Sequence, residues 1–288
     1  MDFYITALIQ GLCFAGIAFG IYLSMKIFNI PDITTDGSYT LGGVVTGSLM
    51  THHQSGFVIV VLVIASGAVA GALTGIIHTK LKINALLAGI LVMTALRSVN
   101  LIILGRSNLP LLGVSSLFSS VNLLANPNQN SFIISLLVVL VLTIIIGYLL
   151  KTDFGIAMRA TGNSEIMIRA LGVNTDRMKI IGLAVANALT ALSGYLVAQQ
   201  QGFADISMGI GIVITGLGSV IIGETVINLL KVTSVWLSLV FVLTGAIIFQ
   251  LVLAFTLSIG VNANWLYGVT ALFVLIIVGL PRLSRRAA

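Results

Sequence analysis

The sequence predicts an all-α polytopic membrane protein with about eight to ten transmembrane helices, some of them broken or re-entrant. Hydrophobic residues make up 58% of the 288 residues and charged residues only 8%, whereas a soluble domain carries about 25% charged residues. Mean hydropathy is +1.15. The apolar residues form long continuous runs, unlike the alternating pattern of a transmembrane β-barrel. We therefore expect a single transmembrane domain over residues 1–288.

Nine apolar runs approach the length of about 20 residues that a spanning helix needs. The second run is short and follows a polar stretch, and the seventh is dense in glycine. Broken helices are tolerated at membrane depth where they line a cavity, so these two runs are candidates for that role. The runs cover residues 3–24, 38–51, 56–78, 84–104, 131–150, 179–200, 207–229, 233–256 and 264–281.

The polar stretch before the second run reads Pro31-Asp-Ile-Thr-Thr-Asp-Gly-Ser-Tyr39. Asp36 or Ser38 can cap the helix that follows. Two acids and a glycine beside a short apolar helix also suit a bent segment that enters a cavity. Both interpretations stay open, and the second makes Asp36, Ser38 and Tyr39 candidates for lining a pathway through the bundle.

The third run carries Gly67, Gly71 and Gly75 on one helix face. Small residues at this spacing let two helices approach closely, so we expect packing within the bundle rather than a subunit interface.

The fourth run contains Arg97, an ionisable residue inside a membrane segment, which is costly and usually functional. Thr94 and Asn100 lie three residues to either side and share its helix face. We predict that this face meets a polar pathway. The alternatives are an arginine that extends to the outer headgroups, or a structural pair with an acidic residue elsewhere.

The later runs contribute fewer candidates. Gly216 and Gly218 belong to the glycine-dense seventh run, which a broken helix would bring to the pathway. Glu224 lies at the inner end of that run, seven residues before Lys231, and suits a polar contact at the membrane face. The connection 105–130 is the longest, and loops of this length are either functional or irregular.

Lys and Arg residues mark the cytoplasmic side of a membrane protein. With the C-terminal tail inside, 12 of the 14 positive residues fall on the same side, the exceptions being Arg97 and Arg106. An odd number of spans then places the N-terminus outside. The net charge of +6 reflects this loop placement, and no nucleic-acid partner is expected.

Motifs for catalysis and cofactor binding are absent from the sequence. It has no P-loop, no His-Glu-x-x-His and no cluster of Cys and His suited to a metal. Cys13 stands alone in an apolar run, and His52 and His53 are expected in a solvated turn. We therefore expect neither an enzyme nor a cofactor or metal site in this chain.

Residues 151–178 form a charged, helix-forming loop in an otherwise apolar chain. Asn163-Ser164 can start a short helix with Ser164 as its N-cap, and Gly172 suits a left-handed C-terminal position. Ile166, Met167 and Ala170 form an apolar stripe, while Glu165 and Arg169 have ion-pair spacing on the exposed side. An exposed apolar stripe needs a partner groove, unless it folds back onto its own bundle.

This loop resembles the cytoplasmic motif of permease subunits of bacterial ABC importers in the branched-chain amino acid and ribose group. That motif runs Arg-Ala-x-Gly-x-Asn-x-x-Ala-Ala-Arg-x-x-Gly-Ile. The matching residues here are Arg159, Ala160, Gly162, Arg169 and Gly172, with Val173 in place of isoleucine. Ser164 replaces the asparagine, and Met167-Ile168 replace the alanine pair. The segments 29–42 and 214–223 are also similar to the family, so the resemblance covers most of the chain.

The resemblance implies a coupling helix that docks on a separate ATPase dimer, where ATP and Mg²⁺ would bind. It implies a second permease copy, an extracytoplasmic substrate-binding protein or lipoprotein, and a place in the bacterial inner membrane. The implied coupling residues are Arg159, Gly162, Asn163, Ser164, Glu165, Met167, Arg169, Ala170 and Gly172.

The sequences of residues 31–38 and 86–96 are similar to those of a permease subgroup associated with aromatic amino acid uptake. Sugar or nucleoside import is the alternative within the family. From another class, an ion-driven secondary transporter would need paired acids inside the membrane. Asp36, Asp205 and Glu224 all fall near the predicted ends of spans, which disfavours it. A membrane enzyme or scaffold would need a catalytic cluster or a soluble domain, and the sequence has neither.

Overall fold

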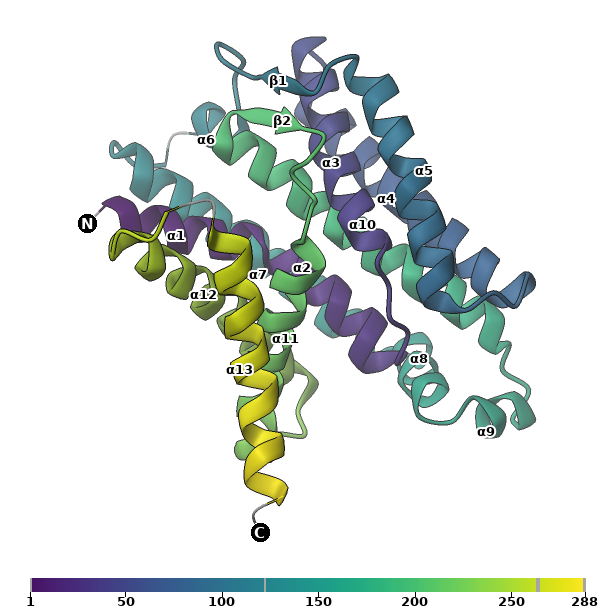
Figure 1. Cartoon of the computed structure of the whole chain (residues 1–288). Helices are drawn as coiled ribbons and strands as arrows, with labels where there is room; N and C mark the ends of the chain where they lie inside the picture. The colour runs from purple at the N-terminus through teal and green to yellow at the C-terminus, as the bar shows by residue number, and fades with distance from the viewer. Residues whose placement is uncertain (1, 122, 263–264, 287–288) are drawn as a thin grey trace.

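The computed structural model describes residues 2–121, 123–262 and 265–286. It is a bundle of helices with a small two-stranded sheet at one end (Figure 1). Seven helical segments in the described residues are long and apolar enough to cross a membrane, which confirms the predicted all-α polytopic fold. They are Phe3–Ile27, Gly56–Lys80, Ala85–Leu104, Pro127–Lys151, Thr175–Gln201, Ile212–Leu229 and Val235–Ser258.

Every predicted run falls on a helix. The first is a rod of two α-helices and a π-helical turn: α1 (Asp2–Cys13), α2 (Ala15–Ile21) and η1 (Tyr22–Ile27). The second is the short, more polar α3 (Thr34–Thr51). The remaining runs correspond to α4 (Gly56–Lys80), α5 (Ala85–Leu104), α7 (Pro127–Lys151), α10 (Thr175–Gln201), α11 (Ile212–Leu229), α12 (Val235–Ser258) and α13 (Leu266–Arg286).

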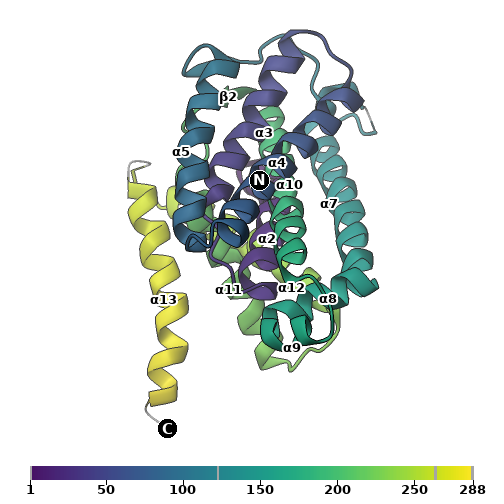
Figure 2. The ribbon, with the colours of Figure 1, turned by 90° about the vertical axis from the view of Figure 1, so that its right-hand side faces the viewer.

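The long connection between α5 and α7 is structured rather than irregular. It contains β1 (Asn108–Pro110) and α6 (Leu117–Ser120). β1 pairs antiparallel with β2 (Phe203–Asp205), and Leu109 lies opposite Ala204. This sheet lies at the opposite end of the bundle from α8 (Asp153–Asn163) and α9 (Glu165–Ala170), as Figure 2 shows.

α10 is the central helix, and it packs against α3, α4 and α2. About 72% of the residues in its apolar stretch are buried. The corresponding share is 28% in α4 and in α5, so these two helices present much of their surface outward. The glycines at positions 67, 71 and 75 lie on the face of α4 that touches α10. A Cβ on Gly71 would collide with the carbonyl oxygen of Leu183 in α10. This confirms that the glycine repeat serves packing inside the bundle.

The glycine-dense seventh run is interrupted near its start, and the interruption lies outside α11. Residues 207–211 form turns, and α11 then continues unbroken from Ile212 to Leu229. Gly211 has a φ of +80°, a left-handed conformation that a side chain would strain. The interruption therefore lies before α11, between it and β2.

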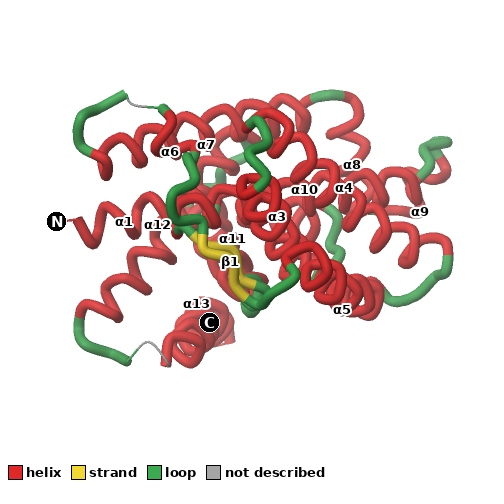
Figure 3. The backbone as a smooth tube through the Cα atoms, turned by 90° about the horizontal axis from the view of Figure 1, so that it is seen from above, coloured by secondary structure: helices red, strands yellow, loops and turns green. Residues whose placement is uncertain are grey.

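α13 lies at the edge of the bundle beside α11, as the view from above shows (Figure 3). Its C-terminal end points toward the end of the molecule that carries α8 and α9 (Figures 1 and 2). The structure describes the backbone of Arg282, Arg285 and Arg286 but not their side chains. The rod α1–α2–η1 ends against α8, so its first residues lie toward the other end. Which end faces the cytoplasm stays a prediction.

Candidate functional site

Two regions carry the predicted site residues: the loop of residues 151–178, called here the coupling loop, and a cavity between α3 and α5. In the coupling loop, the Ser164 side chain accepts a hydrogen bond from the Met167 amide at 3.4 Å and so caps α9. Gly172 follows α9 with a φ of +85°. These observations confirm the predicted helix and its limits. Asn163 is the last residue of α8 and does not start α9.

An apolar surface on α9 is open to solvent. Ile166 is 86% exposed and Met167 63%, and Ala170 is also exposed. The stripe therefore does not fold back onto the bundle, and Ile168 is the residue that packs inward. Leu171, 69% exposed, extends the same surface. The sequence interpretation missed it because Leu171 follows the last helical residue, outside the helical periodicity.

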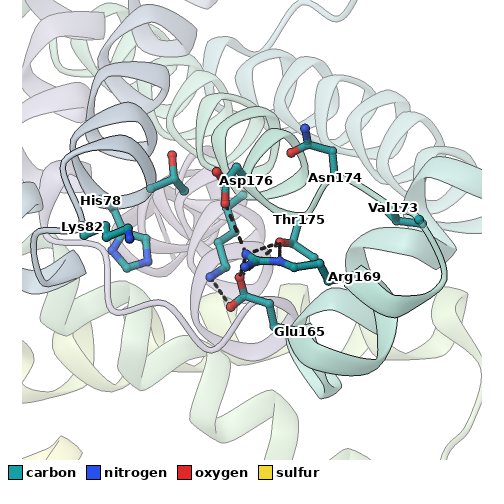
Figure 4. Close-up of a pocket in the computed structure, with 11 residues that line it drawn as sticks. His78, Lys82, Glu165, Arg169, Val173, Asn174, Thr175 and Asp176 are labelled. Atoms are coloured by element: carbon teal, nitrogen blue, oxygen red, sulfur yellow. Dashed lines mark hydrogen bonds and ion pairs between the residues drawn. The ribbon is translucent and has the colours of Figure 1, made fainter.

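Glu165 and Arg169 form the predicted ion pair on the exposed side of α9, and the pair also contacts the start of α10 (Figure 4). Arg169 Nη2 lies 2.8 Å from Glu165 Oε1, and Lys179 Nζ lies 2.6 Å from Glu165 Oε2. The buried Thr175 hydroxyl donates to Glu165 Oε1 at 3.1 Å. Arg169 also lies 3.6 Å from Asp176. Glu165 and Arg169 thus fix α9 to α10, and the sequence interpretation missed the three partners on α10.

The hydrogen bond from Lys179 holds the pKa of the Glu165 carboxyl below its ordinary value of 4.5, although partial burial opposes this. Thr175 and Arg169 add to the effect. The carboxylate is therefore charged at neutral pH, and the network that holds α9 is complete.

The coupling loop is also fixed to the first span. A Cβ on Gly162 would collide with the carbonyl oxygen of Ile27, so only glycine lets α8 approach η1 here. Asn29 Nδ2 donates to the Gly162 carbonyl oxygen at 3.1 Å. Gly162 is therefore a packing position between α8 and η1. Arg159 is exposed on the same helix.

Glu224 has a different partner from the one its sequence position suggests. It forms an ion pair with Lys26 of η1 and not with Lys231. This pair joins the C-terminal end of the first span to the C-terminal half of α11. Lys80 and Asp176, 3.1 Å apart, join the ends of α4 and α10 in the same way.

The cavity between α3 and α5 has a volume of about 300 Å³ and is closed on a third side by residues 206–210. Four of the predicted pathway residues, Asp36, Thr94, Arg97 and Asn100, line it together. They come from two helices that are far apart in the sequence, and no spacing rule predicts that they meet. The remaining lining residues are Gly37, Thr40, Met93, Ile206, Gly209 and Ile210.

Asp36 does not cap its own helix, which corrects one of the two interpretations. The N-cap position of α3 is Ile33, and the carboxylate that accepts from the first helical amide, that of Thr34, is Asp32, whose Oδ1 lies at 2.9 Å. Asp36 lies within the first turn of α3 and accepts hydrogen bonds from the start of α11. The donors are the amides of Gly211 at 3.3 Å and Val213 at 2.8 Å.

Arg97 and Asn100 have unused hydrogen-bonding capacity. Within the described residues, Arg97 makes no ion pair within 4.0 Å. Asn100 is 1% exposed, and its Nδ2 donates to the Gly37 carbonyl oxygen at 3.4 Å. Its Oδ1 has no hydrogen-bond partner in the described part of the chain. The Thr94 hydroxyl donates to its own helix, to Ile90 and Leu91.

Four other predicted pathway residues do not line the cavity. The Ser38 hydroxyl donates to Asn187 Oδ1 at 2.7 Å in a buried network, and Tyr39 is buried against Phe14. Gly216 packs on the first span, and Gly218 packs on Phe249. The sequence interpretation missed Asn187, although a lone asparagine in an apolar run is a signal. It holds Ser38 and also Asp32, the latter at 2.7 Å.

No group of three or more His, Cys, Asp and Glu residues that could hold a metal ion occurs among the described residues. A multi-pass helical bundle, with a cavity lined by both polar and apolar side chains and an exposed apolar helix at one end, fits a membrane transport protein.

The chain belongs to the family of permease components of branched-chain amino acid transport systems, whose pattern matches residues 3–279. It is 36% identical to a tyrosine transport system permease protein of Clostridioides difficile, over 99% of this chain and 93% of that protein. An uncharacterized protein of Rickettsia prowazekii is 35% identical over 78% of each chain. A ribose import permease protein of Haemophilus influenzae is 25% identical, over 73% of this chain and 64% of that protein. The chain is thus a multi-pass permease, a type of protein that lies in the inner membrane of bacteria.

Proposed function

We propose that this permease is the membrane-spanning subunit of an ATP-binding-cassette importer and that α9 docks on a separate ATPase subunit. The observation that carries the proposal is the exposed apolar surface of Ile166, Met167, Ala170 and Leu171. An apolar surface on a short helix in water needs a partner groove. ATP and Mg²⁺ would bind to the ATPase dimer, and this chain would not hydrolyse ATP.

The way in which α9 is held supports the coupling role. A docking helix can transmit movement only if it is attached firmly to the spans that must move. The Glu165 network joins α9 to α10, the central helix of the bundle, while Gly162 and Asn29 join α8 to the first span. Closure of the ATPases would therefore act on the buried core of the permease and not on a peripheral helix.

The further partners follow from the family. A second copy of this chain would complete the pathway as a homodimer, because one small bundle supplies one set of cavity residues. An extracytoplasmic binding protein would deliver the substrate at the end that carries β1, β2 and α6.

We infer an amino acid, aromatic or otherwise apolar, as the substrate. The tyrosine permease relative supports this more strongly than the ribose permease relative, which is less similar and matches a smaller part of the chain. An ion-driven carrier is the candidate from another class. It would need a titrating acid pair in the membrane, whereas Asp32 and Asp36 accept hydrogen bonds from backbone amides at helix starts and Glu224 pairs with Lys26.

The test is an affinity purification of the tagged chain from mild detergent, with mass spectrometry of what accompanies it, together with uptake of radiolabelled L-tyrosine by cells that express the complete transport system. We expect a stoichiometric ATPase, and uptake that stops when ATP is depleted but continues when a protonophore collapses the proton gradient. A stable chain without an ATPase, or uptake abolished by the protonophore at constant ATP, would contradict the proposal.

A further inference from the structure

We propose that the α3–α5 cavity binds its substrate as a zwitterion. Arg97 would bind the α-carboxylate, and Asp36 together with Asn100 Oδ1 would bind the α-ammonium. The inference rests on the proposed function as an amino acid importer, and it assigns the recognition to named groups in this chain.

The first argument is the separation of two opposite charges in one cavity. Arg97 and Asp36 both line it, yet within the described residues neither makes an ion pair within 4.0 Å. Asp36 accepts two backbone amides and Arg97 is exposed, but in the described part of the chain neither has an opposite charge as its partner, and charged groups at membrane depth usually pair with one another or with a ligand. A ligand that carries one negative and one positive group would bridge Arg97 and Asp36. The net charge of such a ligand is zero.

The second argument is the unused acceptor on Asn100. A buried amide oxygen without a partner costs about 1–3 kcal/mol, so native proteins seldom contain one. Asn100 lines the cavity from α5, one helical turn from Arg97. Its free Oδ1 therefore suits a donor that arrives with the ligand.

The third argument is the match between the donors of an ammonium group and the acceptors in the cavity. An α-ammonium has three N–H donors. An ionised carboxylate offers about four lone-pair sites. The amides of Gly211 and Val213 take one site on each oxygen of Asp36, which leaves acceptor capacity on both. With Asn100 Oδ1, the cavity can accept all three donors, while the Arg97 guanidinium offers a two-pronged contact to the carboxylate.

The apolar side of the cavity suits the side chain of the substrate. Met93, Ile206 and Ile210 form this side, and a methionine adapts its shape to the group that it contacts. The volume of about 300 Å³ lies at the small end of the range for ligand pockets, so one small molecule would fill it. A sugar would leave both charges unpaired, and an amine or an acid alone would leave one.

The test uses the full chain in lipid nanodiscs, with equilibrium binding of radiolabelled L-tyrosine. Competitors would be unlabelled L-tyrosine, tyramine, which lacks the carboxylate, and 3-(4-hydroxyphenyl)propionate, which lacks the amine. The variants are Arg97→Gln and Asn100→Leu. Arg106→Gln is the matched control, because Arg106 follows the same helix and does not line the cavity.

We expect Arg97→Gln and Asn100→Leu each to weaken L-tyrosine binding about 10- to 100-fold, the effect of losing a hydrogen bond to a charged group. Arg106→Gln should bind like the original chain, and both competitors that lack one charge should be at least about 10-fold weaker than L-tyrosine. Asn100→Leu is informative about folding as well. It removes the unpartnered acceptor and also the long hydrogen bond of 3.4 Å from Nδ2 to the Gly37 carbonyl oxygen, so the two effects oppose each other and the thermal midpoint should change little.

Unchanged binding in both variants, or equal competition by tyramine and L-tyrosine, would overturn the inference. Uptake by the complete transporter separates this result from a failure of the proposed function. If the original importer takes up L-tyrosine at the same rate with and without Arg97→Gln and Asn100→Leu, the importer role stands and the zwitterion site is refuted. If the original chain neither binds nor transports any amino acid, both proposals fall.

Discussion

Asp36 and Val213 are 177 positions apart, yet Asp36 Oδ1 accepts a hydrogen bond of 2.8 Å from the Val213 backbone amide. A second amide, that of Gly211, points at the other oxygen of the same carboxylate. A side chain at the start of α3 thus caps the start of α11. Because α11 packs on the first span and on α12, this cap joins the cavity wall to the rest of the bundle.

Substitution of Asp36 should separate its capping role from its charge. Asparagine keeps an acceptor oxygen and alanine does not, so Asp36→Ala should destabilise the protein by about 0.5–2 kcal/mol and Asp36→Asn by clearly less. Both should lose uptake, because neither supplies the negative charge. Stability would be measured by denaturant unfolding of the detergent-purified chain, and uptake with radiolabelled L-tyrosine. Normal uptake in Asp36→Asn would show that the charge is not needed.

The apolar surface of α9 should be essential for assembly with the ATPase. In Ile166→Glu a carboxylate replaces a side chain that is 86% exposed, so the permease should fold and reach the membrane normally. The buried carboxylate would oppose docking, and recovery of the ATPase in an affinity purification should fall at least about tenfold. Leu112→Glu is the control, since Leu112 is 88% exposed and closely follows β1, which lies at the opposite end of the bundle from α9 (Figure 1). An equal loss of ATPase in both variants would contradict a specific docking surface.

The orientation in the membrane can be tested by labelling single cysteines. Cys13 is fully buried and should not react with a membrane-impermeant maleimide. We expect Ser164→Cys, at the exposed start of α9, to react only after the membrane is opened. Leu112→Cys should react in intact spheroplasts. The reverse pattern would place α9 outside and overturn both the orientation and the coupling role.

The apolar runs and the coupling helix follow from local sequence rules. Ser164 and Gly172 mark the two ends of α9 because capping depends on residues within one turn of the helix. Arg97 could be identified from the sequence because a single charged residue in an apolar run is costly and usually functional. These features can be predicted without knowing which segments contact them in the folded protein.

Contacts between distant segments were not predictable in the same way. Asp36 has local grounds to cap α3, but the Thr34 amide at the start of that helix donates to Asp32 instead, and Asp36 accepts from the start of α11, which begins at Ile212. Glu224 pairs with Lys26 rather than with the nearer Lys231 because η1 ends beside α11. The seventh run is interrupted only at residues 207–211, whereas Gly216 and Gly218 within α11 accommodate neighbouring side chains. In each case the tertiary arrangement selected among partners that the local pattern left open.

The close contact at Gly162 gives a further prediction. Gly162→Ala places a methyl group against the Ile27 carbonyl oxygen, so α8 must move away from η1. Overpacking of this kind costs about 1–3 kcal/mol. Transport should fall more than ATPase recovery, because the docking surface of α9 remains. The ratio of substrate uptake to ATP hydrolysis in reconstituted vesicles would measure this. Gly56→Ala is the control, since no atom lies within 4 Å of a Cβ built at that position.

The Glu165 network should make the attachment of α9 sensitive to acid. Because Lys179, Thr175 and Arg169 hold the pKa of Glu165 below 4.5, the folded state binds this proton less readily than the unfolded chain does. The stabilisation is therefore complete above a pH of about 4.5 and is lost as the pH falls through the lowered folded pKa. At neutral pH the network is insensitive to small changes in pH.

Glu165→Gln removes the titrating group and tests this directly. The variant should have a lower thermal midpoint than the original chain at pH 7, and the difference between the two should shrink as the pH is lowered below about 4.5. Asp153→Asn changes an exposed carboxyl at the start of α8 and serves as the control, whose difference from the original chain should not follow this course. A constant gap between Glu165→Gln and the original chain from pH 7 to acid would mean that Glu165 does not hold α9 through its charge. The ion pairs with Lys179 and Arg169 would then be incidental to coupling, and the attachment of α9 would depend on Ile168 packing alone.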